Sequence, residues 1–313
     1  MRTRVVVMDS TKRNRKFEGY CVLTQKALKR TLNKELRKNL SRETYKGDGF
    51  LYSPGTVPIL LVAHLDTVHK ETPKTIVYEE GKISSPQGIG GDDRCGVYMV
   101  MEILKEIPCH VLFCEDEEKG GEGSFRFTQT KLCKSLVGEF QYVIELDRRG
   151  SNDAVYYSMY NKDFSDFVTE SFFKEAYGTF TDICELCPAL QVAGVNLSCG
   201  YYKQHTLGEY VVLDEMETLI RETKRLIRRT KADEIYELEE SAENTVDPLD
   251  SALDYGSGYY TITYVTNNGE EKYFDISAIS GAEAFGWFAY KTGCYWSNIL
   301  SVDYNSDDYG FEW

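Results

Sequence analysis

A buried strand that ends in polar residues is predicted by Ile59-Leu60-Leu61-Val62-Ala63-His64-Leu65-Asp66-Thr67-Val68. Its first four residues form a short apolar run after Pro58, which is typical of a buried strand in a sheet. His64 and Asp66 follow directly, so two polar side chains stand where this strand ends. The stretch therefore predicts a central strand with a polar site at its carboxyl end.

Strands and helices alternate after this stretch. Apolar residues at helical spacing predict a helix at Val97 to Ile107. Short apolar runs predict strands at His110 to Cys114 and at Tyr142 to Leu146, and helices are expected at Asp163 to Tyr177 and at Leu213 to Arg229. This alternation predicts an α/β fold with a mostly parallel sheet sandwiched by helices.

Polar residues beside these elements make one candidate site. In open parallel α/β sheets, ligands bind outside the carboxyl ends of the strands. The candidates stand at strand ends, at the start of the long helix and in a later loop: His64, Asp66, Asp92, Glu117, Glu118, Asp147 and His205.

The chemistry of these side chains favours bound metal ions. Carboxylates gathered in one cleft repel each other strongly unless cations offset their charge. His64, Asp92 and Asp147 can bind one divalent cation. His205 and Glu118 can bind a second, with Asp92 as a bridge that holds the ions roughly 3.5–4 Å apart. Mixed imidazole and carboxylate ligation suits zinc, with cobalt or manganese as alternatives.

These motifs resemble those of the co-catalytic zinc exopeptidases, the group of peptidase T, glutamate carboxypeptidase and the zinc aminopeptidases. The matching elements, in type and chain order, are His-Leu-Asp-Thr-Val at 64–68, Gly-Asp-Asp-Arg at 91–94, Asp-Glu-Glu at 116–118, Asp147 and His205. The resemblance covers roughly residues 45–230. It implies a zinc exopeptidase-like fold with two metal ions.

The resemblance also implies a role for each matching residue. The implied metal ligands are His64, Asp92, Glu118, Asp147 and His205. Glu117 is implied as the general acid and base. Asp66 is implied as the partner that orients His64, a role that is common for the free nitrogen of a metal-bound histidine.

One departure from the peptidase T pattern is large. Those enzymes insert a lid domain between the equivalents of Asp147 and His205. Only residues 148–204 intervene here, and their pattern indicates strands and helices of the catalytic domain. We therefore expect a chain without the lid, closer to the lidless aminopeptidases.

Composition narrows the choice of partners. The formal net charge is -14 and the isoelectric point is near 4.9, which argues against nucleic acid or an anionic membrane as the main partner. The nine cysteines are scattered and odd in number, and no signal peptide is recognised. These features predict reduced thiols and a cytoplasmic location. The sequence does not indicate an oligomeric state.

A change in composition near residue 231 predicts a domain boundary. Residues 1–231 are expected to form the catalytic domain, and residues 232–254 an acidic linker. Residues 255–313 are expected to form a small α+β module. Strands at Tyr259 to Val265 and Lys272 to Ile276 flank a turn at Asn267-Asn268-Gly269, and a helix at Ser280 to Thr292 precedes a strand at Ile299 to Tyr304.

The function expected from these features is hydrolysis of a peptide or amide bond in a small substrate by an aminopeptidase or dipeptidase. Glu115, Asp116 and Glu209 could attract a free α-amino group, and Arg148 and Arg149 could bind a substrate carboxylate or pair with the acidic cluster. Two alternatives stay open: an N-acyl amino acid deacylase, and a binding or scaffold protein that reuses the fold.

Overall fold

The computed structural model describes residues 3–7, 13–157, 161–176, 178, 180–238, 258–266, 270–278, 284–285, 288, 291–292 and 299–305. The chain divides into two compact units, Met1–Glu239 and Glu240–Trp313. Within the described ranges, no helix is both long and apolar enough to cross a bilayer.

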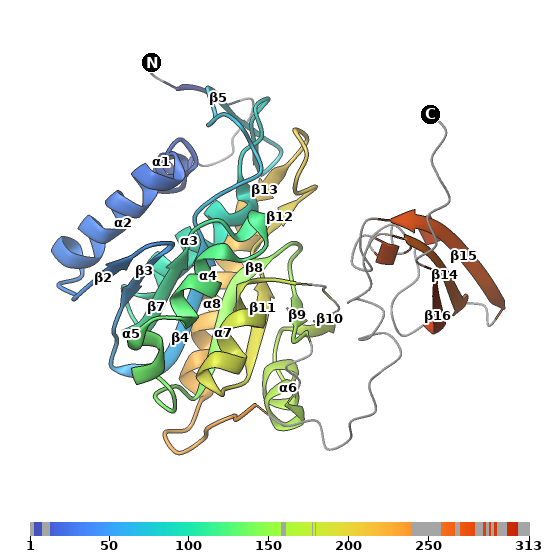
Figure 1. Cartoon of the computed structure of the whole chain (residues 1–313). Coiled ribbons are helices and arrows are strands. Elements are labelled where there is room, and N and C mark those ends of the chain that lie inside the picture. Colours follow the sequence, from blue (N-terminus) through green and yellow to red (C-terminus); the bar gives the residue numbers. More distant parts are fainter. Residues whose placement is uncertain are drawn as a thin grey trace. The chain divides into compact units, whose positions relative to one another are not determined.

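The first unit is built on an eight-stranded sheet (Figure 1). Its strands, in spatial order, are β10 (Lys174–Ala176), β9 (Asp153–Val155), β11 (Gly194–Ser198), β8 (Tyr142–Arg148), β4 (Val57–His64), β7 (Cys109–Cys114), β3 (Phe50–Ser53) and β2 (Tyr45–Gly47). The four central strands, β11, β8, β4 and β7, are mutually parallel. Neighbouring parallel strands have their carboxyl ends at the same edge of the sheet, so this order brings the carboxyl ends of β4, β7 and β8 together.

Helices cover both faces of this sheet. One face packs against α1 (Arg15–Cys21), α2 (Gln25–Asn39), α3 (Gly91–Ile103), α6 (Lys162–Thr169) and α8 (Leu213–Arg229). The other packs against α4 (Glu122–Thr128), α5 (Lys131–Ser135) and α7 (Asp182–Leu190). Along β4, Leu61 points into the first core and Leu60 and Val62 into the second, because side chains alternate across a strand. The predicted fold class is confirmed.

A second sheet, of five strands, was not predicted. Its order is β1 (Arg4–Val7), β5 (Thr75–Glu79), β6 (Lys82–Ser84), β13 (Tyr210–Val212) and β12 (Tyr201–Tyr202). The strands are short and come from distant parts of the chain, so no single apolar run in the sequence predicts them. The turn between β12 and β13 carries His205, which makes this sheet part of the framework of the site.

One predicted helix is wrong in its second half. The helix expected at Asp163 to Tyr177 ends at Thr169, and Lys174–Ala176 forms strand β10. Lys174 pairs with Asp153 of β9 in parallel register. Pairing with a distant strand overrides the local helical pattern here.

The last part of the first unit extends beyond the predicted boundary at residue 231. Tyr236 is nearly buried and its ring stacks on Phe167, with centroids 5.6 Å apart. Val192 forms an isolated bridge with Glu237. Residues 232–238 therefore pack on the first unit. The rest of the predicted acidic linker lies outside the described residues, and the three-part division of the chain stays a prediction.

The second unit contains a three-stranded antiparallel sheet in the order β15 (Glu271–Ala278), β14 (Gly258–Val265), β16 (Ile299–Asn305). Ile262, Phe285 and Phe288 share its small core. Residues 284–285, 288 and 291–292 are helical, within the segment where a helix was expected. The predicted turn at 267–269 lies outside the described residues.

Candidate metal centre

The predicted ligands lie at the carboxyl edge of the central sheet. His64 is the last residue of β4, Asp147 is near the end of β8, and Glu118 belongs to a short 3-10 turn at Glu117–Lys119 after β7. Asp92 lies in the non-helical first turn of α3. His205 comes from the loop between β12 and β13. Residues far apart in the chain thus converge on one place.

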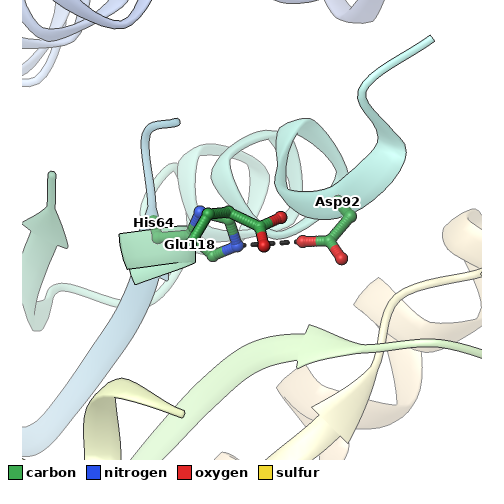
Figure 2. A group of neighbouring side chains, drawn as sticks. All are labelled: His64, Asp92 and Glu118. Carbon is green, nitrogen blue, oxygen red and sulfur yellow. Dashed lines mark hydrogen bonds and ion pairs between the residues drawn. The ribbon is translucent and has the colours of Figure 1, made fainter. Parts of the chain in front are cut away.

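Two sets of ligand atoms share the Asp92 carboxylate. In the first set, His64 Nε2 lies 2.9 Å from Asp92 Oδ1 and 3.3 Å from Asp147 Oδ1. In the second set, His205 Nε2 lies 3.2 Å from Asp92 Oδ2 and 3.2 Å from Glu118 Oε1. Each Asp92 oxygen therefore faces a different imidazole. Figure 2 shows His64, Asp92 and Glu118 turned toward one another.

These separations match those of atoms that share a metal ion. Two ligand atoms at about 2.0–2.2 Å from a tetrahedral zinc ion lie about 3.3–3.6 Å apart, close to the separations found here. Glu118 Oε1 is buried, and no hydrogen-bond partner for it is found among the described residues, although His205 Nε2 is close. A buried carboxylate oxygen and an imidazole nitrogen that face each other without hydrogen-bond geometry are suited to bind the same cation. The donor set therefore fits divalent metal ions. We call Asp92, Glu118 and Asp147 the ligand group.

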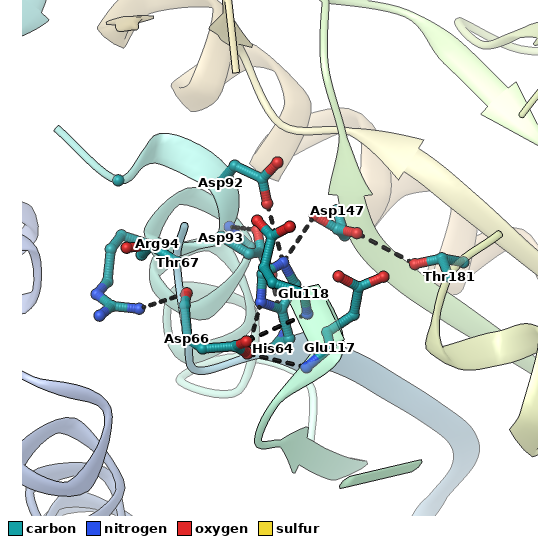
Figure 3. A network of polar contacts seen from close by, with 12 residues as sticks. His64, Asp66, Thr67, Asp92, Asp93, Arg94, Glu117, Glu118, Asp147 and Thr181 are labelled. Atoms are coloured by element: carbon teal, nitrogen blue, oxygen red, sulfur yellow. Dashed lines mark hydrogen bonds and ion pairs between the residues drawn. The ribbon is translucent and has the colours of Figure 1, made fainter. Parts of the chain in front are cut away.

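A second group of carboxylates is held by backbone amides instead (Figure 3). Asp66 accepts from the backbone N–H groups of Glu117 and Glu118, both at 3.1 Å, and its Oδ1 lies 3.2 Å from His64 Nδ1. Asp66 thus ties the imidazole of β4 to the turn after β7. In this position it can orient His64 as the sequence predicted.

Asp93 and Glu209 play the same kind of structural role. Asp93 accepts from the backbone amides of His64, at 3.1 Å, and Gly96, at 2.9 Å. Glu209 is fully buried and accepts from the amides of Gly90 and Asp92, at 2.8 and 3.0 Å. We call Asp66, Asp93 and Glu209 the framework group, since their oxygens hold the loops that carry the ligands.

Asp93 also lies close enough to other potential ligands to share a metal ion with them. His64, Asp93 and Asp147 present ligand atoms within 4.8 Å of one another, as do His64, Asp92 and Glu118. Both Asp93 oxygens already accept backbone hydrogen bonds, which leaves them less free for a cation. We therefore assign Asp93 to the framework group.

Gly96 allows α3 to approach the end of β8. A Cβ atom at this position would lie 1.7 Å from the carbonyl oxygen of Leu146. Real side chains cannot occupy that space, so only glycine lets the start of α3 rest directly on the strand that carries Asp147. The glycine in Gly91-Asp92-Asp93-Arg94-Cys95-Gly96 thus fixes the distance between two ligands.

Charge in the site is unevenly compensated. Burial disfavours protonation of His64, but the charge of Asp147 and hydrogen bonds to neighbouring carboxylates outweigh it, and the His64 pKa is raised well above its usual value. The nearby carboxylates of Asp92 and Glu118 raise the pKa of His205 to about 10. In the chain without cations, both imidazoles therefore act as positive partners of the carboxylates.

The two imidazoles are too few for the carboxylates present. Burial and the charge of Asp92 raise the pKa of Asp147 to about 7. Burial and neighbouring carboxylates raise the pKa of Glu117 to about 9. Burial likewise raises the pKa values of Glu145 and Asp182, which lie beside the site. This excess of buried acidic groups is the electrostatic complement of a cation.

A cleft of about 190 Å³ opens beside the ligands. Its lining includes Glu117, Arg149, Tyr157, Phe180 and His205. His205 is about half exposed, with 52% of its side chain accessible. The cleft therefore gives a small substrate access to the ligand group and to Glu117.

The structure bears on two expectations about charged residues near the cleft, and it corrects the first. Glu115 forms an ion pair with Lys29, Asp116 bonds to Lys119, and Glu209 is committed to the backbone and to His69. None of the three is free to attract a substrate amine. Arg148 bonds to Asp153 at 3.2 Å, whereas Arg149 is exposed and lines the cleft.

Several supporting residues escaped sequence reasoning. Tyr201 donates to the backbone oxygen of Asp147 at 2.9 Å, and Thr181 donates to its carboxylate at 3.1 Å. Arg94 is buried and donates to the carbonyl oxygen of Leu65 at 2.7 Å. Only Arg94 belongs to one of the motifs quoted above. No pattern in the sequence around Tyr201 or Thr181 indicates that they support the site.

Comparison with known proteins agrees with this geometry. Residues 52–190 match Peptidase family M28. The matched segment, which is less than half of the chain, is similar to the co-catalytic zinc exopeptidases. This match supports a metallo-exopeptidase that depends on a divalent metal to hydrolyse peptides, and it argues against the scaffold alternative. No curated protein matches the chain in sequence.

Solved structures of peptidases share the fold of this metallo-exopeptidase. Aminopeptidase PepT from Bacillus cereus aligns over 68% of this chain and 96% of its own, with 14% identity and a TM-score of 0.54. A tripeptidase from Staphylococcus aureus aligns over 68% and 96%, with 12% identity and a TM-score of 0.54. The TET1 peptidase of Pyrococcus horikoshii aligns over 68% and 98%, with 14% identity and a TM-score of 0.51. At such low identity the likeness establishes the fold alone.

Proposed function

We propose that this chain is a two-metal aminopeptidase or dipeptidase that acts on small peptides. One observation carries the proposal: the two oxygens of Asp92 face two different imidazoles, at 2.9 and 3.2 Å. A carboxylate in that position is suited to bridge two ions. The PepT and tripeptidase likenesses agree with a small peptide as the substrate.

Five residues would hold the ions. His64 and Asp147 serve one ion, His205 and Glu118 the other, and Asp92 both. The chemistry supplied by two bound cations is activation of water and polarisation of the scissile carbonyl. Zinc suits these ligands best, and cobalt or manganese can replace it.

Glu117 is the residue that we assign to proton transfer. It lines the cleft together with Glu118 and Asp147. A nearby divalent cation favours its ionised form and offsets the effect of burial. Glu117 then accepts a proton from the attacking water and passes it to the amine that leaves. Asp66 keeps His64 oriented throughout.

A deacylase of N-acyl amino acids is the second candidate, since Arg149 suits its substrates as well as it suits a dipeptide. The Arg149 side chain is exposed in the cleft, and no ion-pair partner for it is found in the described part of the chain. An arginine so placed can bind a substrate carboxylate. Both dipeptides and N-acyl amino acids carry one, so Arg149 does not decide between them.

Two measurements test the proposed function. Elemental analysis of extensively dialysed protein after reconstitution with zinc should give two metal ions per chain. Hydrolysis rates on peptides of two to five residues, each free or N-acetylated, should show a preference for the free amino terminus. A stoichiometry well below one contradicts the two-metal proposal. A strong preference for N-acetylated substrates favours the deacylase.

We also propose a cytoplasmic location. The eight cysteines in the described ranges are free, and seven of them are buried. Unpaired thiols are typical of reducing compartments.

A further inference from the structure

The orientation of the Asn196 side chain is fixed by a backbone amide. Asn196 is buried in β11, and its Oδ1 lies 2.9 Å from the backbone nitrogen of Asp147. A backbone N–H can only donate, so the amide atom that faces it must be the oxygen. The Asn196 Nδ2 group therefore points the other way, toward the Tyr157 hydroxyl oxygen at 3.0 Å.

This orientation determines the direction of the Tyr157 hydroxyl proton. Asn196 Nδ2 carries only hydrogens, so the Tyr157 oxygen must accept in this contact and its own proton points elsewhere. No acceptor for that proton is found among the residues that the structure describes. Burial raises the pKa of Tyr157 well above its usual value, so the proton is retained. Tyr157, which lines the cleft, thus carries a hydroxyl proton for which the described residues offer no acceptor.

The backbone and packing hold Tyr157 in this place. Its φ is 55°, in the left-handed region that a tyrosine seldom adopts. Its ring lies against Gly178, where a Cβ atom would be 2.9 Å from Tyr157 Cε1. Strained positions of this kind persist where the surrounding structure requires them, often at functional sites. Here the position makes Tyr157 part of the lining of the cleft, together with Asn196, Glu117 and Asp147.

We propose that Tyr157 is a catalytic residue that donates a hydrogen bond to the carbonyl oxygen of the scissile bond. The inference rests on the proposed peptide hydrolysis. Attack by water forms a bond between the water oxygen and the carbonyl carbon. The π electron pair of the carbonyl group moves onto the carbonyl oxygen. Tyr157 holds the resulting negative charge and keeps its own proton. The water proton goes to Glu117 and then to the amine nitrogen as the carbon–nitrogen bond breaks.

A donor aimed at developing charge acts on the transition state more than on the bound substrate. Removal of one such donor typically lowers kcat by about 10²–10³-fold. We therefore expect Tyr157→Phe, reconstituted with zinc, to lose about 10²-fold or more in kcat with little change in KM. A phosphinate analogue of a peptide, which carries the tetrahedral oxygen, should bind more weakly by a similar factor. The metal content and Tm should equal those of the wild type.

Tyr202→Phe is the matched control. The Tyr202 hydroxyl donates to Glu215 outside the cleft, so the same loss of one oxygen should leave kcat and phosphinate binding unchanged. Equal losses in the two variants would assign the effect to general destabilisation and overturn the proposal.

A second variant keeps the phenol and turns its proton away. In Asn196→Asp, one carboxylate oxygen can still accept from Asp147 N–H, while the other faces Tyr157 and now accepts its proton. We expect kcat to fall about as far as in Tyr157→Phe, and to fall little further when both changes are combined. Fully additive losses would mean that Asn196→Asp acts through its charge and not through Tyr157, which contradicts the proposal.

The outcomes separate the two proposals. A wild-type protein without hydrolysis of any peptide or N-acyl substrate removes the proposed function and this inference with it. An active wild type with fully active Tyr157→Phe removes the inference alone. A rise in KM at constant kcat also removes it, because Tyr157 then contributes to substrate binding and not to the transition state.

Discussion

The ligand group and the framework group contain the same residue types at the same edge of one sheet, yet their oxygens meet different partners. Oxygens of the ligand group, Asp92, Glu118 and Asp147, face imidazole nitrogens at 2.9–3.3 Å. Oxygens of the framework group, Asp66, Asp93 and Glu209, accept backbone N–H groups at 2.8–3.1 Å. Asp66 and Glu209 also contact one imidazole each, but unlike the ligand group they have backbone donors as well.

This difference separates two uses of a buried carboxylate. Backbone hydrogen bonds satisfy the framework group within the chain, so its members stabilise loop geometry without a ligand. Among the residues that the structure describes, no backbone N–H group donates to a carboxylate of the ligand group, and two imidazoles do not balance its charge. We therefore expect the ligand group to depend on cations, and we expect replacements in the two groups to have different consequences.

Replacement of the shared ligand should have the largest effect. We expect Asp92→Ala to lose binding at both ion positions and essentially all turnover, because each position loses one oxygen. The far-ultraviolet circular dichroism should stay that of the wild type. Elemental analysis and peptide hydrolysis measure these effects. Retention of two ions per chain would show that Asp92 is not the bridge.

Glu117 belongs to neither group and should affect turnover alone. Glu117→Gln keeps the shape of the side chain but cannot accept a proton from water. Loss of a general base typically costs about 10²–10⁴-fold in rate. The metal content should stay at two ions per chain. Full turnover on the best substrate would rule out Glu117 as the base.

Asp66 should act on metal affinity through His64. The two Asp66 oxygens accept the backbone amides of the turn after β7, and one of them also faces the His64 imidazole. In Asp66→Asn, an NH₂ group replaces one of these oxygens. Loss of such a partner typically weakens metal binding about 10–100-fold. Competition with a chelator of known affinity measures the change. An unchanged affinity would place Asp66 outside the control of His64.

Glu209 should affect stability more than chemistry. Glu209→Gln turns an NH₂ group toward a backbone donor and leaves a buried N–H group without its acceptor, which typically costs about 1–3 kcal/mol. Urea unfolding of the metal-free protein should show the loss. Asp163→Asn, on the exposed surface of α6, should change stability far less and serves as a control. Equal stability of the wild type and Glu209→Gln would contradict the framework role.

Removal of the second unit should have the smallest effect. A chain that ends after residue 239 keeps Tyr236 in its place against Phe167. We expect it to stay folded, to bind two ions and to hydrolyse peptides at the wild-type rate. An unfolded or metal-free product would show that the first unit needs residues 240–313.

Local patterns in the sequence were sufficient for the central architecture. The apolar run at 59–62 and those at 110–114 and 142–146 correspond to β4, β7 and β8. The predicted helix at Leu213 to Arg229 has the bounds of α8. These elements are long or strongly apolar, so burial alone determines their type. Because parallel strands end together, the polar residues after them could also be expected to meet.

Contacts between distant short elements could not be predicted in the same way. Strand β10 replaced the second half of an expected helix because it pairs with β9. Strands β12 and β13, which flank the His205 loop, are two and three residues long. So few residues carry no periodicity that separates them from a loop.

The sequence by itself determined which side chains are candidates to bind metal ions and which predicted strands precede them, because residue type and hydrophobic period are local properties. Only the tertiary structure decided which carboxylates support loops and which face the imidazoles. Glu209 holds the amide of Asp92, 117 residues away in the chain, at 3.0 Å. Asn196 and Tyr157 meet beside Asp147 through the order of the sheet. A carboxylate has the same chemistry wherever it stands, and its role follows from the donors that the fold brings to it.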